Sequence, residues 1–204
     1  VEKPDQEAVP SRQFDISKID FELLSREFAY TRRKNLLLRD LDELVNQQLA
    51  KMLFANPQRI DYYDRYQEII DAYNAEQNRA TIEKTFMDLM ELASSLDMEQ
   101  QRYVREGFSS DEELSVYDLL FSENLTKQEI ETIKKVSVDL LTKIKQQIAK
   151  LDHWTDKQET KAIVDNLIRN TLWQELPNSY DVSDIQTYQK KIYEYVYMRY
   201  PEVA

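Results

Sequence analysis

The chain has 204 residues, of which 38 are acidic and 27 basic, and its net charge is -11. It contains one glycine, one histidine and no cysteine. These counts exclude disulfides, thiol nucleophiles, cysteine-ligated zinc and sites built from several imidazoles. The negative charge also opposes extensive nucleic-acid binding, because phosphate contacts need a positive field.

Helix-forming residues dominate the composition, and helix breakers are few. We therefore expect an all-α protein, an irregular multi-helix bundle of about seven to nine helices with no sheet. No apolar run reaches the roughly 18 residues of a membrane-spanning helix, and the first residues are not signal-like. The expected location is the cytoplasm, with no membrane contact.

The start of the chain has the composition of a linker, with Pro4 and Pro10 among polar residues and no initiator methionine. We expect residues 1–15 to connect to a preceding domain, so that the chain is part of a larger protein. Residues 16–204 are expected to form a C-terminal helical domain, with 16–122 and 123–204 as candidate sub-lobes.

The first helical region runs from Ser17 to about Phe54, and its apolar stripe changes phase along the way. Between the two phases lies the segment 31–35, Thr-Arg-Arg-Lys-Asn, which has no apolar residue. The pattern predicts either two helices or one helix passing between two packing partners. Asn56-Pro57 then predicts a stop and a new start, because proline is tolerated in a first turn.

Beyond Pro57 the periodicity predicts helices over 57–73, 81–93 and 98–106. Tyr73-Asn74 ends the first of them, and Asn78 or Thr81 caps the second. A turn near Ser94-Ser95 is expected between the second and the third.

The only glycine, Gly107, is predicted to be the left-handed residue just past a helix end, since glycine alone has no Cβ penalty there. Ser109 or Ser110 can then cap the next helix, with Glu112 or Glu113 as the reciprocal partner. The segment therefore predicts a tight joint before a short helix over 110–121.

The longest amphipathic segment runs from Thr126 to Leu151 and starts with capping-box spacing. The turn 152–155 leads into a helix that stops before Pro177. The apolar residues of that helix are Ala162, Ile163, Leu167, Ile168 and Leu172. A last helix over 184–200 carries Tyr193, Tyr197 and Tyr200, which are candidates for core packing and for a partner interface.

No catalytic residue is predicted, because one glycine cannot build a phosphate-binding loop or a nucleophile elbow. No metal site is predicted, because the chain has no cysteine and a single histidine. His153 is interpreted as a capping or packing residue at a helix joint. Arg32, Arg33 and Lys34 are candidate contacts to phosphate, DNA or an acidic partner, with a solvated helix face as the alternative. The predicted structural joints are Tyr73, Asn74, Gly107 and Trp154.

Several segments, taken in order, resemble the C-terminal region of the R (HsdR) subunit of type I restriction-modification enzymes. They are the Phe-x-x-x-x-Arg-Lys-Asn stretch that ends at Asn35, Tyr73-Asn74, Glu83 to Ala93, Glu106 to Leu120, and Asp152-x-Trp154. The resemblance covers about residues 14–180. This chain departs from the pattern at His153, which is inserted, and at Phe108, where leucine is usual.

The resemblance implies a parent subunit that is an ATP-dependent DNA translocase and endonuclease, using ATP and Mg2+ in domains that precede this one. For this region it implies a non-catalytic assembly domain without a cofactor. Its expected partners are the other domains of the R subunit and the modification and specificity subunits, with DNA reached through the parent. The alternatives are an accessory DNA- or nucleotide-contacting module that uses residues 32–34, and a purely structural cap of the preceding helices.

Overall fold

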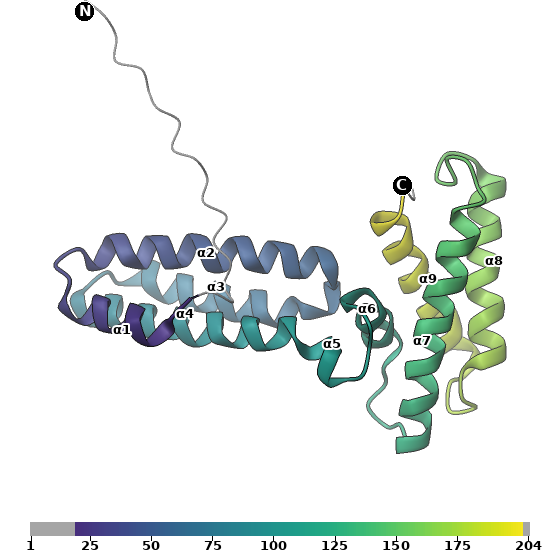
Figure 1. Ribbon diagram of the computed structural model, residues 1–204, viewed down its shortest axis with the longest axis horizontal. Coiled ribbons are helices and arrows are strands. Elements are labelled where there is room, and N and C mark those ends of the chain that lie inside the picture. Colours follow the sequence, from purple (N-terminus) through teal and green to yellow (C-terminus); the bar gives the residue numbers. More distant parts are fainter. Residues whose placement is uncertain (1–18, 202–204) are drawn as a thin grey trace, which may run out of the picture. The chain divides into compact units, whose positions relative to one another are not determined.

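The computed structural model describes residues 19–201, and within this range the chain is all-α, with nine α-helices and no strand (Figure 1). This confirms the expected fold class. The expected linker 1–15 lies outside the described residues. The helices are α1 (Phe21–Tyr30), α2 (Lys34–Ala55), the 3-10 helix η2 (Pro57–Arg59), α3 (Ile60–Ala75), α4 (Arg79–Gln100), α5 (Arg102–Arg105), α6 (Asp111–Leu120), α7 (Lys127–Ile148), α8 (Gln158–Glu175) and α9 (Val182–Arg199).

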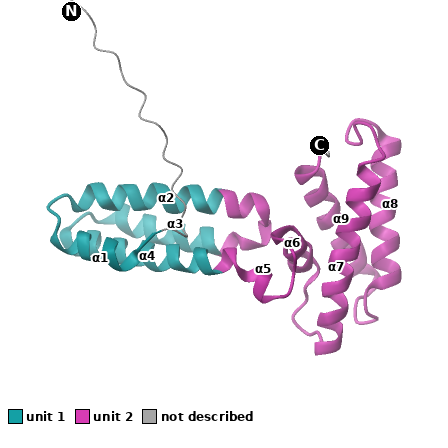
Figure 2. Ribbon diagram, in the orientation of Figure 1, with its two compact units in different colours: residues 1–50, 62–98 teal, residues 51–61, 99–204 magenta. Residues whose placement is uncertain are grey.

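The chain divides into two compact units, one made of residues 1–50 and 62–98 and the other of 51–61 and 99–204 (Figure 2). The candidate sub-lobes 16–122 and 123–204 stay a prediction. In the division into two units, α6 belongs with the later helices because it packs against α7 and α9. Residues 51–61 belong to the same unit because the 3-10 helix η2 contacts α6.

Unit 1 is built from α1, α3 and α4 together with most of α2. The predicted break at 31–35 separates α1 from α2, so the two-helix alternative is correct. Phe28 of α1 stacks on Phe86 of α4, with ring centroids 3.6 Å apart. The Tyr66 hydroxyl of α3 donates to Asp42 of α2 over 2.8 Å. These contacts tie the helices of unit 1 around an apolar interior.

The turn predicted near Ser94-Ser95 is wrong, because α4 runs unbroken from Arg79 to Gln100. The Ser95 hydroxyl donates to the carbonyl of Glu91 one turn earlier, over 2.9 Å, so this serine bonds within the helix instead of ending it. Ala93 and Leu96, on either side of the serine pair, are fully buried, so the helix continues through the pair with its apolar face in the core.

Unit 2 has its core between α6, α7, α8 and α9 (Figure 1). The amphipathic pattern of α7 predicted the buried face, which includes Ile133, Leu140 and Ile144. The predicted capping box is present, because the amide of Glu129 donates to the Thr126 hydroxyl and the Glu129 carboxylate accepts from the Thr126 amide. The hydrogen bonds from Thr126 lower the pKa of Glu129.

Candidate functional site

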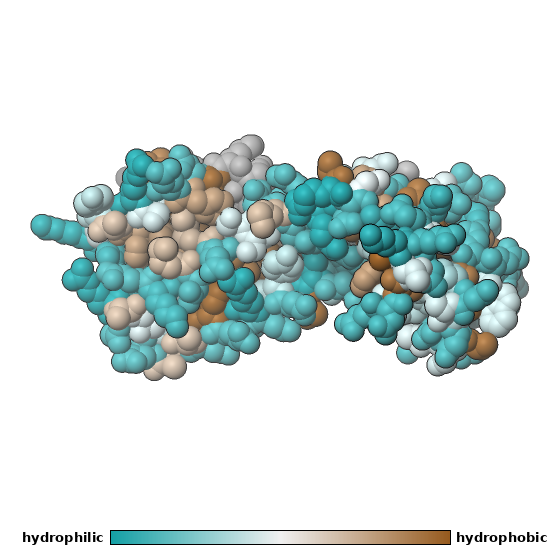
Figure 3. Space-filling model, turned by 90° about the horizontal axis from the view of Figure 1, so that it is seen from below, coloured by the Kyte–Doolittle hydropathy of each residue, from teal (hydrophilic) through white to brown (hydrophobic). Residues whose placement is uncertain are grey.

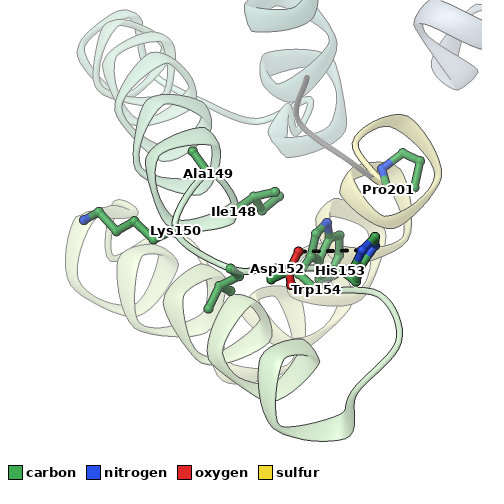
Figure 4. Close-up of a pocket in the computed structure, with 8 residues that line it drawn as sticks. Ile148, Ala149, Lys150, Asp152, His153, Trp154 and Pro201 are labelled. Carbon is green, nitrogen blue, oxygen red and sulfur yellow. Dashed lines mark ion pairs between the residues drawn. The ribbon is translucent and has the colours of Figure 1, made fainter.

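A hollow of about 390 Å³ lies where α7 ends and the chain turns toward α8, between Lys150, Trp154 and Pro201 (Figure 4). Asp152 and His153 lie side by side in it, with 3.6 Å between Asp152 Oδ1 and His153 Nε2. Both side chains are exposed, and no serine, threonine or cysteine lines the hollow. The pair therefore lacks a nucleophile to activate, and it is an exposed contact at a helix joint.

No group of three or more metal-ligating side chains is placed to hold an ion within residues 19–201. None of the helices in that range is long and apolar enough to cross a membrane.

Trp154 anchors the same joint from inside. Its side chain is 1% exposed, and its indole Nε1 donates to the carbonyl of Tyr200 over 2.7 Å. The indole ring meets the rings of Tyr193 and Tyr197 edge-on, at 6.1 and 5.7 Å between centroids. Two of the three candidate interface tyrosines therefore pack on a core residue, while Tyr197 keeps 39% of its surface exposed.

Gly107 is the left-handed residue that the sequence predicts, with φ of 84°. The amide of Gly107 donates to Val104 O and that of Phe108 to Tyr103 O, so the end of α5 is closed by two backbone hydrogen bonds. Ser110 is the residue that caps α6, and the carboxylate of Glu113 accepts from the Ser109 amide over 2.7 Å. The joint is tight because both helix ends are capped within a few residues.

A buried ion network lies next to this joint, inside unit 2. Arg59, whose side chain is 4% exposed, donates to both oxygens of Asp111 over 2.9 and 2.6 Å and to Glu99 over 3.0 Å. Glu99 also accepts from Arg102 Nε over 2.8 Å. Arg102 in turn forms a two-bonded pair with Asp118. The network thereby links η2, α4, α5 and α6.

Asn56 extends the network, because its Nδ2 donates to Asp118 over 2.6 Å. Burial opposes the charge of Arg59, but its bonds to Asp111 and Glu99 outweigh burial and raise its pKa. Burial also opposes the charge of Arg102, but its bonds to Asp118 and, to a smaller extent, Glu99 outweigh burial and raise its pKa. Both guanidinium groups and all three carboxylates are thus engaged in ion pairs with one another.

Sequence reasoning missed this network. Arg59 and Glu99 look like ordinary members of charged helices, and their separation of 40 residues hides the pairing. One signal was available: Asp111 and Asp118 are seven residues apart, which places them on the same face of α6. Both belong to the stretch from Glu106 to Leu120 that carries the family resemblance.

The basic segment 32–34 separates into two environments. Arg32 and Arg33 are exposed in the break between α1 and α2. Lys34 is directed inward: its Nζ is 2.6 Å from Glu83 Oε1 and 4.9 Å above the ring of Phe28. The hydrogen bond from Lys34 is the main cause that lowers the pKa of Glu83. Lys34 is therefore a structural cation of unit 1.

Tyr73 and Asn74 lie in the last turn of α3, which ends at Ala75, one residue beyond the predicted joint. Asn78 caps α4, since its side-chain oxygen accepts from the Thr81 amide over 2.9 Å. Tyr73 borders a small hollow of unit 1 that Asn35 also lines. The structure thus brings together two segments that carry the family resemblance.

The fold and the contacts described above define a class: a helical domain whose distinctive residues cap helices and pair charges inside the core. The family model described as type I restriction enzyme HindI endonuclease subunit-like, C-terminal, matches residues 7–200. The chain belongs to this family, and the resemblance seen in the sequence is confirmed. Comparisons with curated proteins and with solved structures gave no match.

Proposed function

We propose that this domain is the assembly module of its R subunit, joining the motor part of the subunit to the modification and specificity subunits. In this proposal it has no catalytic activity and holds no cofactor. ATP, Mg2+ and DNA are handled by other domains of the parent subunit, in the cytoplasm.

One observation carries the proposal: the stretch from Glu106 to Leu120, the most distinctive of the chain, is used for internal contacts. Gly107 and Ser110 close helix ends, and Asp111 and Asp118 pair with buried arginines. These contacts fix the shape of unit 2 around the joint between α5 and α6. A helical unit held in one shape is well suited to presenting a surface to partner subunits.

Deletion of residues 19–201 from the full R subunit tests the proposal. We expect ATP hydrolysis by the remaining motor to persist, while affinity for the purified complex of modification and specificity subunits falls. The matched control is the intact subunit with Gly107→Asn, which retains the domain. A truncated subunit that assembles with unchanged affinity would instead favour the structural cap.

A second candidate function, an accessory DNA contact, is favoured by the corner between α1 and α2. Tyr30 there is 89% exposed, beside the exposed Arg32 and Arg33. A free aromatic ring can stack on a base, and arginine forks suit phosphate oxygens.

The double variant Arg32→Ala/Arg33→Ala tests this contact in the full subunit. If the arginines bind phosphate, DNA affinity falls, and the slope of log affinity against log salt decreases by roughly one unit for each lost contact. Lys34→Ala is the control, because it removes an internal ion pair and should affect stability rather than the salt slope. Unchanged DNA affinity in the double variant would leave the solvated-surface interpretation.

A further inference from the structure

The hollow that Asn35 and Tyr73 border lies inside unit 1, between α2, α3 and α4, and has a volume of about 240 Å³. We term it the unit 1 hollow. Leu38 of α2, Ile70 of α3 and Leu89 of α4 form its apolar wall, and both leucines are buried. Most of the surface seen in Figure 3 is hydrophilic, so an accessible space with an aliphatic wall stands apart from it. Spaces between the helices of a bundle are common places for ligand sites.

Three polar side chains border the unit 1 hollow, namely those of Asn35, Tyr73 and Thr85. Among residues 19–201, no hydrogen bond or ion pair engages any of the three side chains. Thr85 matters most, because it is 3% exposed and a buried hydroxyl without a partner is unfavourable. The buried hydroxyl of Ser137, by contrast, donates to the carbonyl of Ile133 over 2.7 Å. The three polar groups at the hollow are therefore available to a bound molecule.

The two charged residues at the unit 1 hollow are Asp42 and Arg39. Asp42 Oδ1 accepts from the Tyr66 hydroxyl over 2.8 Å, so the protein already holds this carboxylate. The side chain of Arg39 is 72% exposed, and its pair with Asp40 is long, at 3.8 Å. The buried part of a ligand should therefore be neutral, because a charge there would lack a partner. An anionic group outside the hollow could pair with the guanidinium of Arg39.

The lining of the hollow distinguishes between classes of small molecule. An aliphatic molecule would leave the Thr85 hydroxyl without a partner, and an indole offers one polar group where the hollow has three. A sugar would place many hydroxyls against the aliphatic wall. A nucleobase combines a flat ring with donors and acceptors along its edge, which matches both parts of the lining. A cavity of about 150 Å³ holds benzene, so the unit 1 hollow has room for a larger ring system.

We infer that the unit 1 hollow binds a nucleobase, with the ring against the aliphatic wall and the edge bonded to Thr85 and Asn35. A phosphate attached to the base pairs with Arg39. The base belongs to a free nucleotide or to an unstacked position of a single DNA strand, and its chemistry at the hollow is the same in both cases. The ligand takes part in no reaction. The inference goes beyond the proposed assembly function and does not depend on it.

Equilibrium dialysis of the full 204-residue chain against the four labelled deoxynucleosides, one at a time, tests the inference. We expect at least one of them to bind with a Kd below about 1 mM. Thr85→Val and Asn35→Ala should each weaken this binding by about fivefold, as the loss of one hydrogen bond does. The matched controls are Thr171→Val, at a threonine of unit 2 that is 5% exposed, and Asn74→Ala, at an exposed asparagine that does not border the hollow. Both controls should bind as the wild type does.

The melting temperature of Thr85→Val separates a ligand-binding role from a structural one. Valine has nearly the shape of threonine, so the substitution removes a buried hydroxyl that lacks an internal partner. We therefore expect the ligand-free variant to melt at a higher temperature than the wild type while it binds the nucleoside more weakly. A lower melting temperature would show that the protein itself satisfies this hydroxyl, and the inference would be overturned.

Competition against the bound nucleoside identifies the source of the base. A single-stranded oligonucleotide that displaces it at a lower concentration of bases than the deoxynucleoside monophosphate does assigns the site to DNA, and the reverse order assigns it to a free nucleotide. Three results would overturn the inference: no binding of any of the four nucleosides, equal binding by Thr85→Val and the wild type, or binding of indole as tight as that of the best nucleoside. None of them affects the assembly function, which the deletion of residues 19–201 tests by itself.

Discussion

Arg59 and Asp111 form a two-bonded ion pair inside unit 2, joining η2 to the first turn of α6. Arg59 is 4% exposed on its side chain and Asp111 30%, so the guanidinium depends on its partners far more than the carboxylate does. A buried charge without its partner is strongly unfavourable, because the interior does not replace the lost solvation.

We therefore expect Arg59→Met, which keeps much of the side-chain volume, to lower the free energy of unfolding by about 3 kcal/mol, since Asp111 loses its two-bonded pair and Glu99 loses one of its two arginine partners. Urea denaturation measures the change. Arg26→Met is the control, because the pair of Arg26 with Glu22 is largely exposed and should contribute at most about 0.5 kcal/mol. Equal losses in the two variants would mean that burial of the network does not matter.

A side chain at position 107 should destabilise the fold only through the backbone conformation that it disfavours, and not through a steric clash. The φ of 84° disfavours any Cβ, yet a Cβ built there would meet no heavy atom within 4 Å. Gly107→Ala should cost about 1 kcal/mol, and Gly107→Asn less, since asparagine enters the left-handed region more readily. The melting temperatures of both variants measure these losses. An alanine variant as stable as the wild type would contradict the role of Gly107 as the left-handed residue that ends α5.

His153 offers the opposite experiment, because it is the non-glycine residue in the described range that has a positive φ, 45°. Replacing it by glycine removes the strain of a left-handed residue but adds freedom to the unfolded chain, and an exposed contact with Asp152 is lost. His153→Gly should therefore raise stability by up to about 1 kcal/mol, while His153→Val lowers it. A destabilised glycine variant would show that the histidine side chain holds the turn.

The stability of the fold should depend on pH in the alkaline range because of Tyr180. Its hydroxyl donates to the carbonyl of Leu120 over 2.7 Å, and burial raises its pKa above the usual 10.0. The folded chain keeps this proton above pH 10 while the unfolded chain loses it, so the stabilisation is complete below pH 10 and decreases as the pH rises further.

Tyr180→Phe should be about 1 to 2 kcal/mol less stable near neutral pH, because the buried carbonyl of Leu120 loses its donor. The variant should also lose less stability between about pH 10 and about pH 11 than the wild type does. Urea midpoints at three pH values measure both effects. Parallel pH profiles would show that Tyr180 titrates as an exposed tyrosine.

Much of the architecture could be predicted from the sequence, because helix ends depend on contacts between near neighbours. Asn78, Ser110 and Thr126 each accept from an amide three residues ahead, and Gly107 closes a helix with bonds to its own last turn. Such contacts are visible in any short window of sequence. The main error, at Ser94-Ser95, arose because tertiary burial of the neighbouring residues overrides the local preference of serine.

The sequence by itself determined the helical class, most helix boundaries and the family. Only the tertiary structure paired Arg59 with residues 40 and 52 positions away, turned Lys34 toward Glu83, and left Ile163 of the predicted apolar stripe exposed on α8. The physical reason is that burial and ion pairing depend on which helix faces meet, and those faces are chosen by the packing of the whole core rather than by the residues next to them in the chain.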